Sequence, residues 1–164
     1  MEKLSNYIIE AWGGMKQHAL KSDIEAWCEE MKIENYTIND KGEIDVNGNI
    51  WTLKYKDFKE LPYKFGKVNG SFDLSGNPNL ISLKNCPDRV EGYFSCAYCP
   101  QLNSLKGSPN KVNLYFKCSG CPQLDSLDGC PTHVGWNFEC SKCKRKFTKE
   151  EVRSLCRVKK HVLV

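Results

Sequence analysis

Three pairs of cysteines are the residues whose types and spacing most resemble a chemical site. Each pair has the form Cys-x-x-Cys, and 18 residues separate one pair from the next: Cys96 and Cys99, Cys118 and Cys121, and Cys140 and Cys143. Four thiolates from two such pairs complete the tetrahedral coordination that zinc prefers. A zinc site is therefore one hypothesis for these six residues.

The elements that must position the cysteines follow from a repeat of 22 residues. A valine recurs at this interval, an Ile or Phe follows it by four positions, and further apolar residues follow at twelve and fifteen. One such unit cannot bury its apolar side alone, so successive units stack around a shared core. We expect an α+β fold in which about four to five coils form a short β-solenoid over residues 46–147. The valines are Val46, Val68, Val90, Val112 and Val134, and the residues four positions later are Ile50, Phe72, Phe94, Phe116 and Phe138.

A single unit resembles the bacterial type of leucine-rich repeat. Residues 94–102 read Phe-Ser-Cys-Ala-Tyr-Cys-Pro-Gln-Leu, which places Phe94 and Cys96 on one face of a short strand. The family follows its strand with Asn or Cys and then with leucines. The resemblance implies that Asn77 and Cys99 occupy the slot in which that family bonds the backbone of the neighbouring coil.

The register of the repeat supplies the alternative to zinc. The first cysteine of a pair takes the slot of Leu74, and the second takes the slot of Asn77. Neither residue is a zinc ligand, and a buried cysteine behaves as a small apolar residue. We therefore favour a structural role without metal or cofactor, and we keep a zinc-binding module as an alternative.

Both ends of the chain are predicted to form caps. Residues 1–45 form an N-terminal cap with a helix and a hairpin, and residues 148–164 form a C-terminal cap with a helix and a closing strand. The signals are capping boxes at Ser22–Glu25 and Thr148–Glu151, hairpin strands at 36–38 and 44–46, and an apolar segment at 158–164.

The sequence offers no arrangement that predicts catalysis. The histidines are His18, His133 and His161; none belongs to a nucleophile–base motif, and His133 lies at a variable turn slot. A phosphate loop and a glycine-rich dinucleotide turn are both missing from the sequence. We predict no catalytic residues and no enzyme activity.

The outward slots of the stacked strands predict a surface for a protein partner. They carry large aromatic side chains together with a lysine: Trp51, Tyr93, Tyr98, Tyr115 and Lys117. Tyr and Trp dominate the energetic centres of protein interfaces. We therefore predict a protein–protein interaction module that binds through these residues.

The C-terminal segment is basic, with nine Lys or Arg against two Glu from Lys142 onward. Lysines at a sheet end protect it from pairing with another chain, and a basic surface also suits phosphates. We favour the first interpretation and do not expect nucleic acid as the partner, keeping a nucleic-acid-binding module as an alternative.

Neither a membrane span nor a signal-peptide pattern is present, so a cytoplasmic location is expected for a chain with ten cysteines.

Residues 1–11 resemble the capsid-targeting peptides of internal head proteins in T-even-type tailed phages. In that family a protease cuts after a glutamate that follows an aliphatic residue and one intervening residue, which implies a cut between Glu10 and Ala11. The repeats themselves resemble uncharacterised repeat proteins of large gut phages. The resemblances imply a phage-encoded chain acting on a host or viral protein, with a packaged virion protein as the alternative. Partner identity and oligomeric state stay open.

Overall fold

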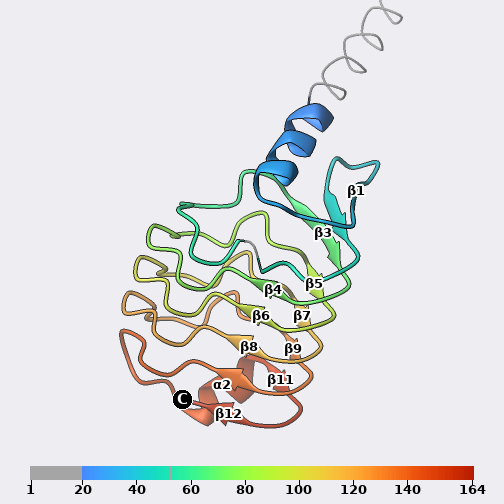
Figure 1. Cartoon of the computed structure of the whole chain (residues 1–164). Helices are drawn as coiled ribbons and strands as arrows, with labels where there is room; N and C mark the ends of the chain where they lie inside the picture. The colour runs from blue at the N-terminus through green and yellow to red at the C-terminus, as the bar shows by residue number, and fades with distance from the viewer. Residues whose placement is uncertain (1–19, 52) are drawn as a thin grey trace, which may run out of the picture.

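The computed structural model describes residues 20–51 and 53–164. Over this part, the chain winds into a β-solenoid of about five turns, with one helix at each end (Figure 1). Residues 20–30 are helical at the N-terminal end, and helix α2, Lys149–Leu155, closes the C-terminal end. The predicted solenoid is therefore confirmed. In the described residues, neither helix is long and apolar enough to cross a bilayer.

Two sheets run along the solenoid, and successive coils contribute one short strand to each. We call the first the valine sheet; its order is β1 Tyr36–Ile38, β2 Ile44–Val46, β3 Phe65–Val68, β5 Arg89–Val90, β7 Lys111–Val112, β9 His133–Val134 and β11 Arg157–Val158. We call the second the phenylalanine sheet; its order is β12 Val162–Leu163, β10 Phe138–Glu139, β8 Phe116–Lys117, β6 Phe94–Ser95 and β4 Phe72–Asp73.

The strand register reproduces the 22-residue repeat. Val68 pairs with Val90 in the valine sheet, and Phe94 pairs with Phe116 in the phenylalanine sheet. Neighbouring strands are parallel throughout, apart from the antiparallel hairpin of β1 and β2. Each side chain therefore lies directly beside the equivalent side chain of the next coil, about 4.8 Å away.

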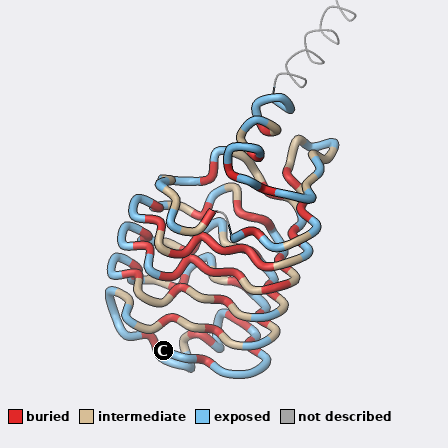
Figure 2. The backbone as a smooth tube through the Cα atoms, viewed as in Figure 1, coloured by how far each residue is buried: buried red, intermediate tan, exposed pale blue. Residues whose placement is uncertain are grey.

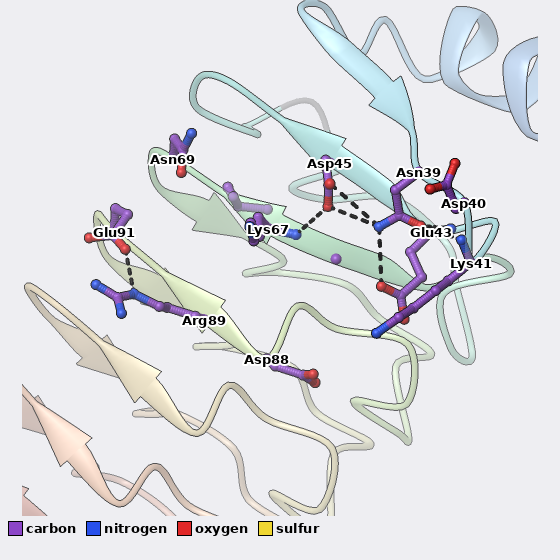
Figure 3. A pocket seen from close by; sticks show the side chains of 12 residues that line it. Asn39, Asp40, Lys41, Glu43, Asp45, Lys67, Asn69, Asp88, Arg89 and Glu91 are labelled. Atoms are coloured by element: carbon purple, nitrogen blue, oxygen red, sulfur yellow. Dashed lines mark hydrogen bonds and ion pairs between the residues drawn. The ribbon is translucent and has the colours of Figure 1, made fainter.

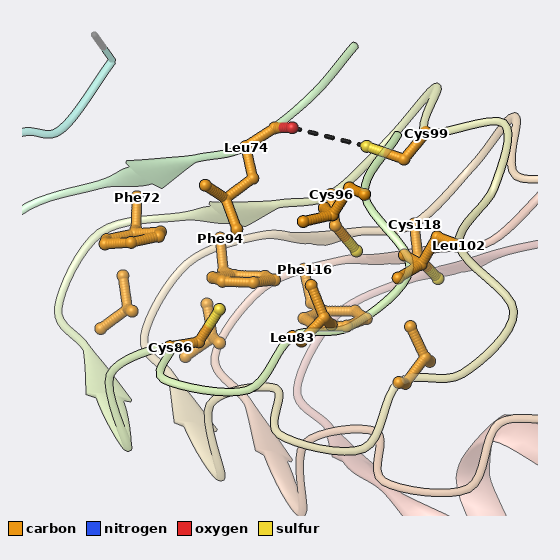
Figure 4. Packing of buried hydrophobic residues seen from close by; sticks show 14 of the residues in the cluster. Phe72, Leu74, Leu83, Cys86, Phe94, Cys96, Cys99, Leu102, Phe116 and Cys118 are labelled. Atoms are coloured by element: carbon orange, nitrogen blue, oxygen red, sulfur yellow. Dashed lines mark hydrogen bonds between the residues drawn. The ribbon is translucent and has the colours of Figure 1, made fainter. Parts of the chain in front are cut away.

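The core is a set of such stacks, which Figure 2 shows as buried stretches along every coil. Phe72, Phe94 and Phe116 are fully buried, with ring centroids 5.9 and 5.6 Å apart and planes only 9° from parallel (Figure 4). The valines close one side of this stack, and the leucines of the return segments close the other. Stacking thus buries an apolar side that a single coil would leave in water.

The N-terminal cap covers the first coil with an aromatic residue. Trp27 points from the helix at 20–30 toward Tyr63 and Phe65, with ring centroids 5.6 and 6.1 Å away. The predicted helix start at Ser22 is wrong, because residues 20 and 21 are already helical. The hairpin of β1 and β2 is confirmed.

The C-terminal cap begins as predicted and ends differently. The Thr148 hydroxyl accepts a hydrogen bond from the Glu151 N–H, and the Glu151 carboxylate accepts one from the Thr148 N–H, which confirms the capping box. The predicted closing strand is instead two strands, β11 and β12, one in each sheet. Lys159 and Lys160 bond back to Val134 and Trp136, so the chain turns the same corner as the coils before it.

Candidate binding surface

The outer face of the phenylalanine sheet carries a hollow of about 420 Å³. Four of the five predicted partner-binding residues line it, namely Tyr93, Tyr98, Tyr115 and Lys117. The fifth, Trp51, has 57% of its surface exposed. Tyr55, which the sequence analysis did not select, completes the group. We call this surface the tyrosine face, made of Trp51, Tyr55, Tyr93, Tyr98 and Tyr115.

Tyr55 and Tyr98 are displayed by an alternation of large and small residues in one slot. The slot has a left-handed backbone in every coil, with φ between 55° and 73°, and it holds Tyr55, Gly76, Tyr98, Gly120 and Lys142. A Cβ atom at Gly76 would lie 2.2 Å from the Tyr55 ring, and one at Gly120 would lie 2.5 Å from the Tyr98 ring. Each tyrosine therefore lies over the glycine of the next coil, and both remain 65–70% exposed.

Tyr55 was not predicted as a binding residue, because the first coil departs from the strict repeat. A spacing of 22 residues assigns this slot to Lys54, whereas Tyr55 lies 21 residues before Gly76. The shift is visible in the core as well, where Leu53 takes the place that Leu74 holds in the next coil: the Leu53 carbonyl accepts from Asn77, and the Leu74 carbonyl accepts from Cys99.

Polar groups form the floor of the hollow. Asp73 and Ser95 line it from outward slots, yet they are buried. The Tyr93 hydroxyl donates to Asp73 Oδ2 at 3.2 Å, and the Ser75 N–H donates to Asp73 Oδ1 at 2.8 Å. Burial, followed by the Asp73 carboxylate, raises the pKa of Tyr93 to about 12, while Trp51 acts in the opposite direction. Tyr93 is therefore a neutral, anchored hydroxyl at ordinary pH.

Two lysines frame the aromatic rings. Lys54 Nζ lies 4.7 Å from the centroid of the Tyr55 ring, and Lys117 Nζ lies 5.4 Å from that of Tyr115. Lys117 also forms an ion pair of 3.4 Å with Glu139. The rings thus carry positive charge at their margins, with a single buried carboxylate, that of Asp73, beneath them.

No family model, curated protein or solved structure matches the chain.

The cysteines lie inside the coils, away from the tyrosine face. Cys96, Cys118 and Cys140 point into the core in the slot of Leu74 (Figure 4 labels the first two). The second cysteine of each pair makes the same kind of bond as Asn77. The Asn77 amide donates to the Leu53 carbonyl at 3.0 Å, and each of these thiols donates to a backbone carbonyl of the preceding coil. The bonds are Cys99 to Leu74 O at 3.4 Å, Cys121 to Cys96 O at 3.3 Å and Cys143 to Cys118 O at 3.4 Å.

These bonds explain why that slot accepts either Asn or Cys, since both place a donor against a carbonyl of the neighbouring coil. All ten cysteines are free thiols. Within residues 20–51 and 53–164, no three His, Cys, Asp or Glu side chains are grouped so that they could hold a metal ion. Desolvation raises the pKa of Cys99 to about 11 and that of Cys121 to about 12, which favours neutral thiols.

The remaining sequence-selected residues lie elsewhere. His133 belongs to strand β9 rather than to a turn, and its Nδ1 lies 2.9 Å from the Thr132 hydroxyl. His161 is exposed beside β12. His18 and the predicted cleavage residues Glu10 and Ala11 fall outside the described residues.

Proposed function

We propose that this chain is a non-enzymatic binding module that holds a protein partner on the tyrosine face. The observation that carries the proposal is the convergence of aromatic side chains from several coils around one hollow. Tyrosine and tryptophan provide large contact areas and lose little conformational freedom on binding. In this proposal the chain is a phage-encoded solenoid of the leucine-rich-repeat-like type. Its partner is a host or viral protein in the cytoplasm.

The setting of these side chains favours binding over a purely structural role. Tyr55 and Tyr98 keep most of their surface in water although each occupies a left-handed backbone position that disfavours side chains other than glycine. A core role would not leave such large rings exposed. Because the rings stand on hydrogen-bonded coils, a partner meets a surface that is already ordered.

The chemistry of the face defines what it fits. An apolar side chain entering the hollow would contact the rings of Tyr93, Tyr98 and Tyr115, and a carboxylate at the margin would meet Lys54. The tyrosine hydroxyls offer hydrogen bonds to a partner backbone. We therefore expect a partner segment that combines an apolar anchor with acidic neighbours.

The repeat itself supplies substitutions that test the proposal. Tyr55→Gly with Tyr98→Gly gives these slots the residue that Gly76 and Gly120 already have, so the coils are expected to fold unchanged. Affinity purification from host lysate, quantified by mass spectrometry, compares this variant with the unaltered chain. We expect the proteins retained specifically by the unaltered chain to fall at least about tenfold, because two central aromatic contacts are lost.

A matched control comes from another exposed apolar residue. Ile81 is 47% exposed on the return segment, and the equivalent slot of the next coil holds Asn103. Ile81→Asn removes exposed apolar surface away from the tyrosine face and should leave retention unchanged. Retention that is equal in the double glycine variant and the unaltered chain would reject the tyrosine face as the docking surface.

A further inference from the structure

A row of basic side chains runs along the outer face of the valine sheet. The residue before the valine is basic in five successive strands, and these residues pair rung to rung: Lys67, Arg89, Lys111, His133 and Arg157. All five are exposed. Adjacent rungs of a sheet are about 4.8 Å apart, so the row forms a nearly continuous line of donors.

The first two rungs are neutralised by acidic neighbours. They border a hollow of about 720 Å³ that is also lined by Asp40, Glu43, Asp45, Asp88 and Glu91 (Figure 3). Arg89 forms an ion pair with Glu91, and the backbone N–H of Lys67 donates to Asp45 Oδ1 at 2.6 Å, which holds that carboxylate at the Lys67 rung. The lining of this hollow has five acidic and three basic side chains, so the cations of this half of the row are more than offset within the chain.

The last three rungs have no such balance. They border a separate hollow of about 740 Å³, whose ionisable lining residues are Lys111, His133, Arg157 and Lys159, all of them basic. Over residues 20–51 and 53–164, the ion pairs of the structure include none of Lys111, Arg157 and Lys159. Cations gathered on one face of a sheet repel one another. An anionic ligand would remove this cost.

An aromatic side chain borders the same hollow. Trp136 lies at the corner between β9 and β10, where earlier coils have Gly70, Gly92 and Leu114. Its ring centroid is 5.5 Å from that of Tyr115, and 45% of its surface is exposed. Trp136 therefore presents an indole face beside the unbalanced cations, supported from behind by Tyr115.

We infer that this hollow binds single-stranded nucleic acid, with phosphates along Lys111, His133, Arg157 and Lys159 and a base stacked on Trp136. The three rungs span about 10 Å, which suits successive phosphates of a chain rather than one isolated anion. Cationic grooves with aromatic platforms are the means by which proteins hold unpaired strands. An acidic peptide would use the cations and leave the indole without a role, and a duplex would keep its bases stacked inside.

Fluorescence anisotropy of the full chain with a short fluorescein-labelled single strand of thymidines tests the inference. We expect saturable binding whose affinity falls with salt, with a log–log slope of about −2 for three phosphate contacts. Poly-glutamate of equal charge serves as competitor and should displace the strand poorly.

Charge and stacking are separated by substitutions. Lys111→Gln with Arg157→Gln should weaken binding at least about tenfold and make the slope shallower by about 1.4, as expected for two lost contacts with a single strand. Lys41→Gln with Lys67→Gln, which removes the same charge from the hollow with the acidic lining, should leave affinity nearly unchanged. Trp136→Leu copies the slot of Leu114 and should weaken binding about tenfold without altering the slope.

The binding measurements on these variants either support or overturn the inference. Loss of binding in the Lys111 and Arg157 variant together with a separate loss in Trp136→Leu supports the inference. Absence of binding at low salt, an equal loss in the Lys41 and Lys67 control, or displacement by poly-glutamate as readily as by unlabelled strand would overturn it. Trp136 packs on Tyr115 of the tyrosine face, whereas Lys111 and Arg157 do not line the hollow of that face. The charge variant therefore separates this test from that of the tyrosine face.

Discussion

Two sets of slots on the same coils differ in how faithfully they repeat. Inside, the slot of Phe94 holds phenylalanine in four successive coils, and the centroids of neighbouring rings lie 5.9, 5.6 and 5.0 Å apart. Outside, the slot of Tyr98 changes from tyrosine to glycine and back, and ends as lysine. An inner side chain must match the coils above and below it, whereas an outer one meets water on one side. Folding therefore restricts which residues can occupy the inner slots, whereas the outer slots can vary and serve binding.

The most direct way to break this comparison is to truncate one residue of each kind. Phe94→Ala leaves a cavity between two stacked rings and should lower the free energy of unfolding by about 3–5 kcal/mol. Tyr98→Gly, in the outer slot, should change it by less than about 1 kcal/mol, because glycine relieves the left-handed backbone. Urea denaturation measures both, and equal losses would contradict the division between inner and outer slots.

Raising the pH tests the interior alone. Burial holds the pKa of Cys99 at about 11 and that of Cys121 at about 12, whereas an unfolded thiol titrates near pH 8.5. The unfolded chain then loses protons that the native chain keeps, so stability is complete below about pH 8.5 and falls as the pH rises toward the native values. Urea midpoints between about pH 8 and pH 10 should show a decline approaching 1.4 kcal/mol per pH unit for each such thiol.

The variant Cys121→Ala provides the control for this pH dependence. It removes one of the shifted thiols, so its stability should fall less steeply over the same range. A decline of unchanged steepness would show that Cys121 does not stay protonated in the native coil.

The smallest expected change in the free energy of unfolding concerns two positions of the basic row on the valine sheet. Lys111→Glu places an acid directly opposite Arg89 and His133 and should raise the free energy of unfolding by about 0.2–1 kcal/mol, because it replaces the like charge opposite Arg89 with an opposite one. Lys67→Glu, beside Asp45, should give no gain. Thermal unfolding at low salt compares the two, and a gain in both would mean that the two halves of the row do not differ in balance.

The interior of this fold could be predicted because its determinants are local and periodic. The spacing of the valines and phenylalanines predicted the coil, and the register of Asn77 with Cys99 predicted a shared bond to the neighbouring backbone. The capping box at Thr148 is local as well. In each case the physics links residues that lie a few positions apart or one full period apart.

The outer surface was harder to predict because it depends on small departures from the period. Tyr55 was missed since the first coil shifts its register by one residue. Asp73 occupies an outward slot of its strand and is nevertheless buried beside Tyr93, which alternation along a strand does not reveal. Arg157 and Lys159 appeared to belong to a basic tail, and only the pairing of β11 with β9 places them in line with Lys111 and His133.

Because the strands are parallel and in register, equivalent residues of successive coils lie at a constant spacing along the solenoid. A change in the number of coils between Tyr55 and Tyr98 would move these two rings apart or together in steps of about 4.8 Å while leaving each coil intact. Duplicating or deleting one whole coil would thus retune the distance between contact points without redesigning any of them. Selection acting on such a chain has a simple route to partners of different size.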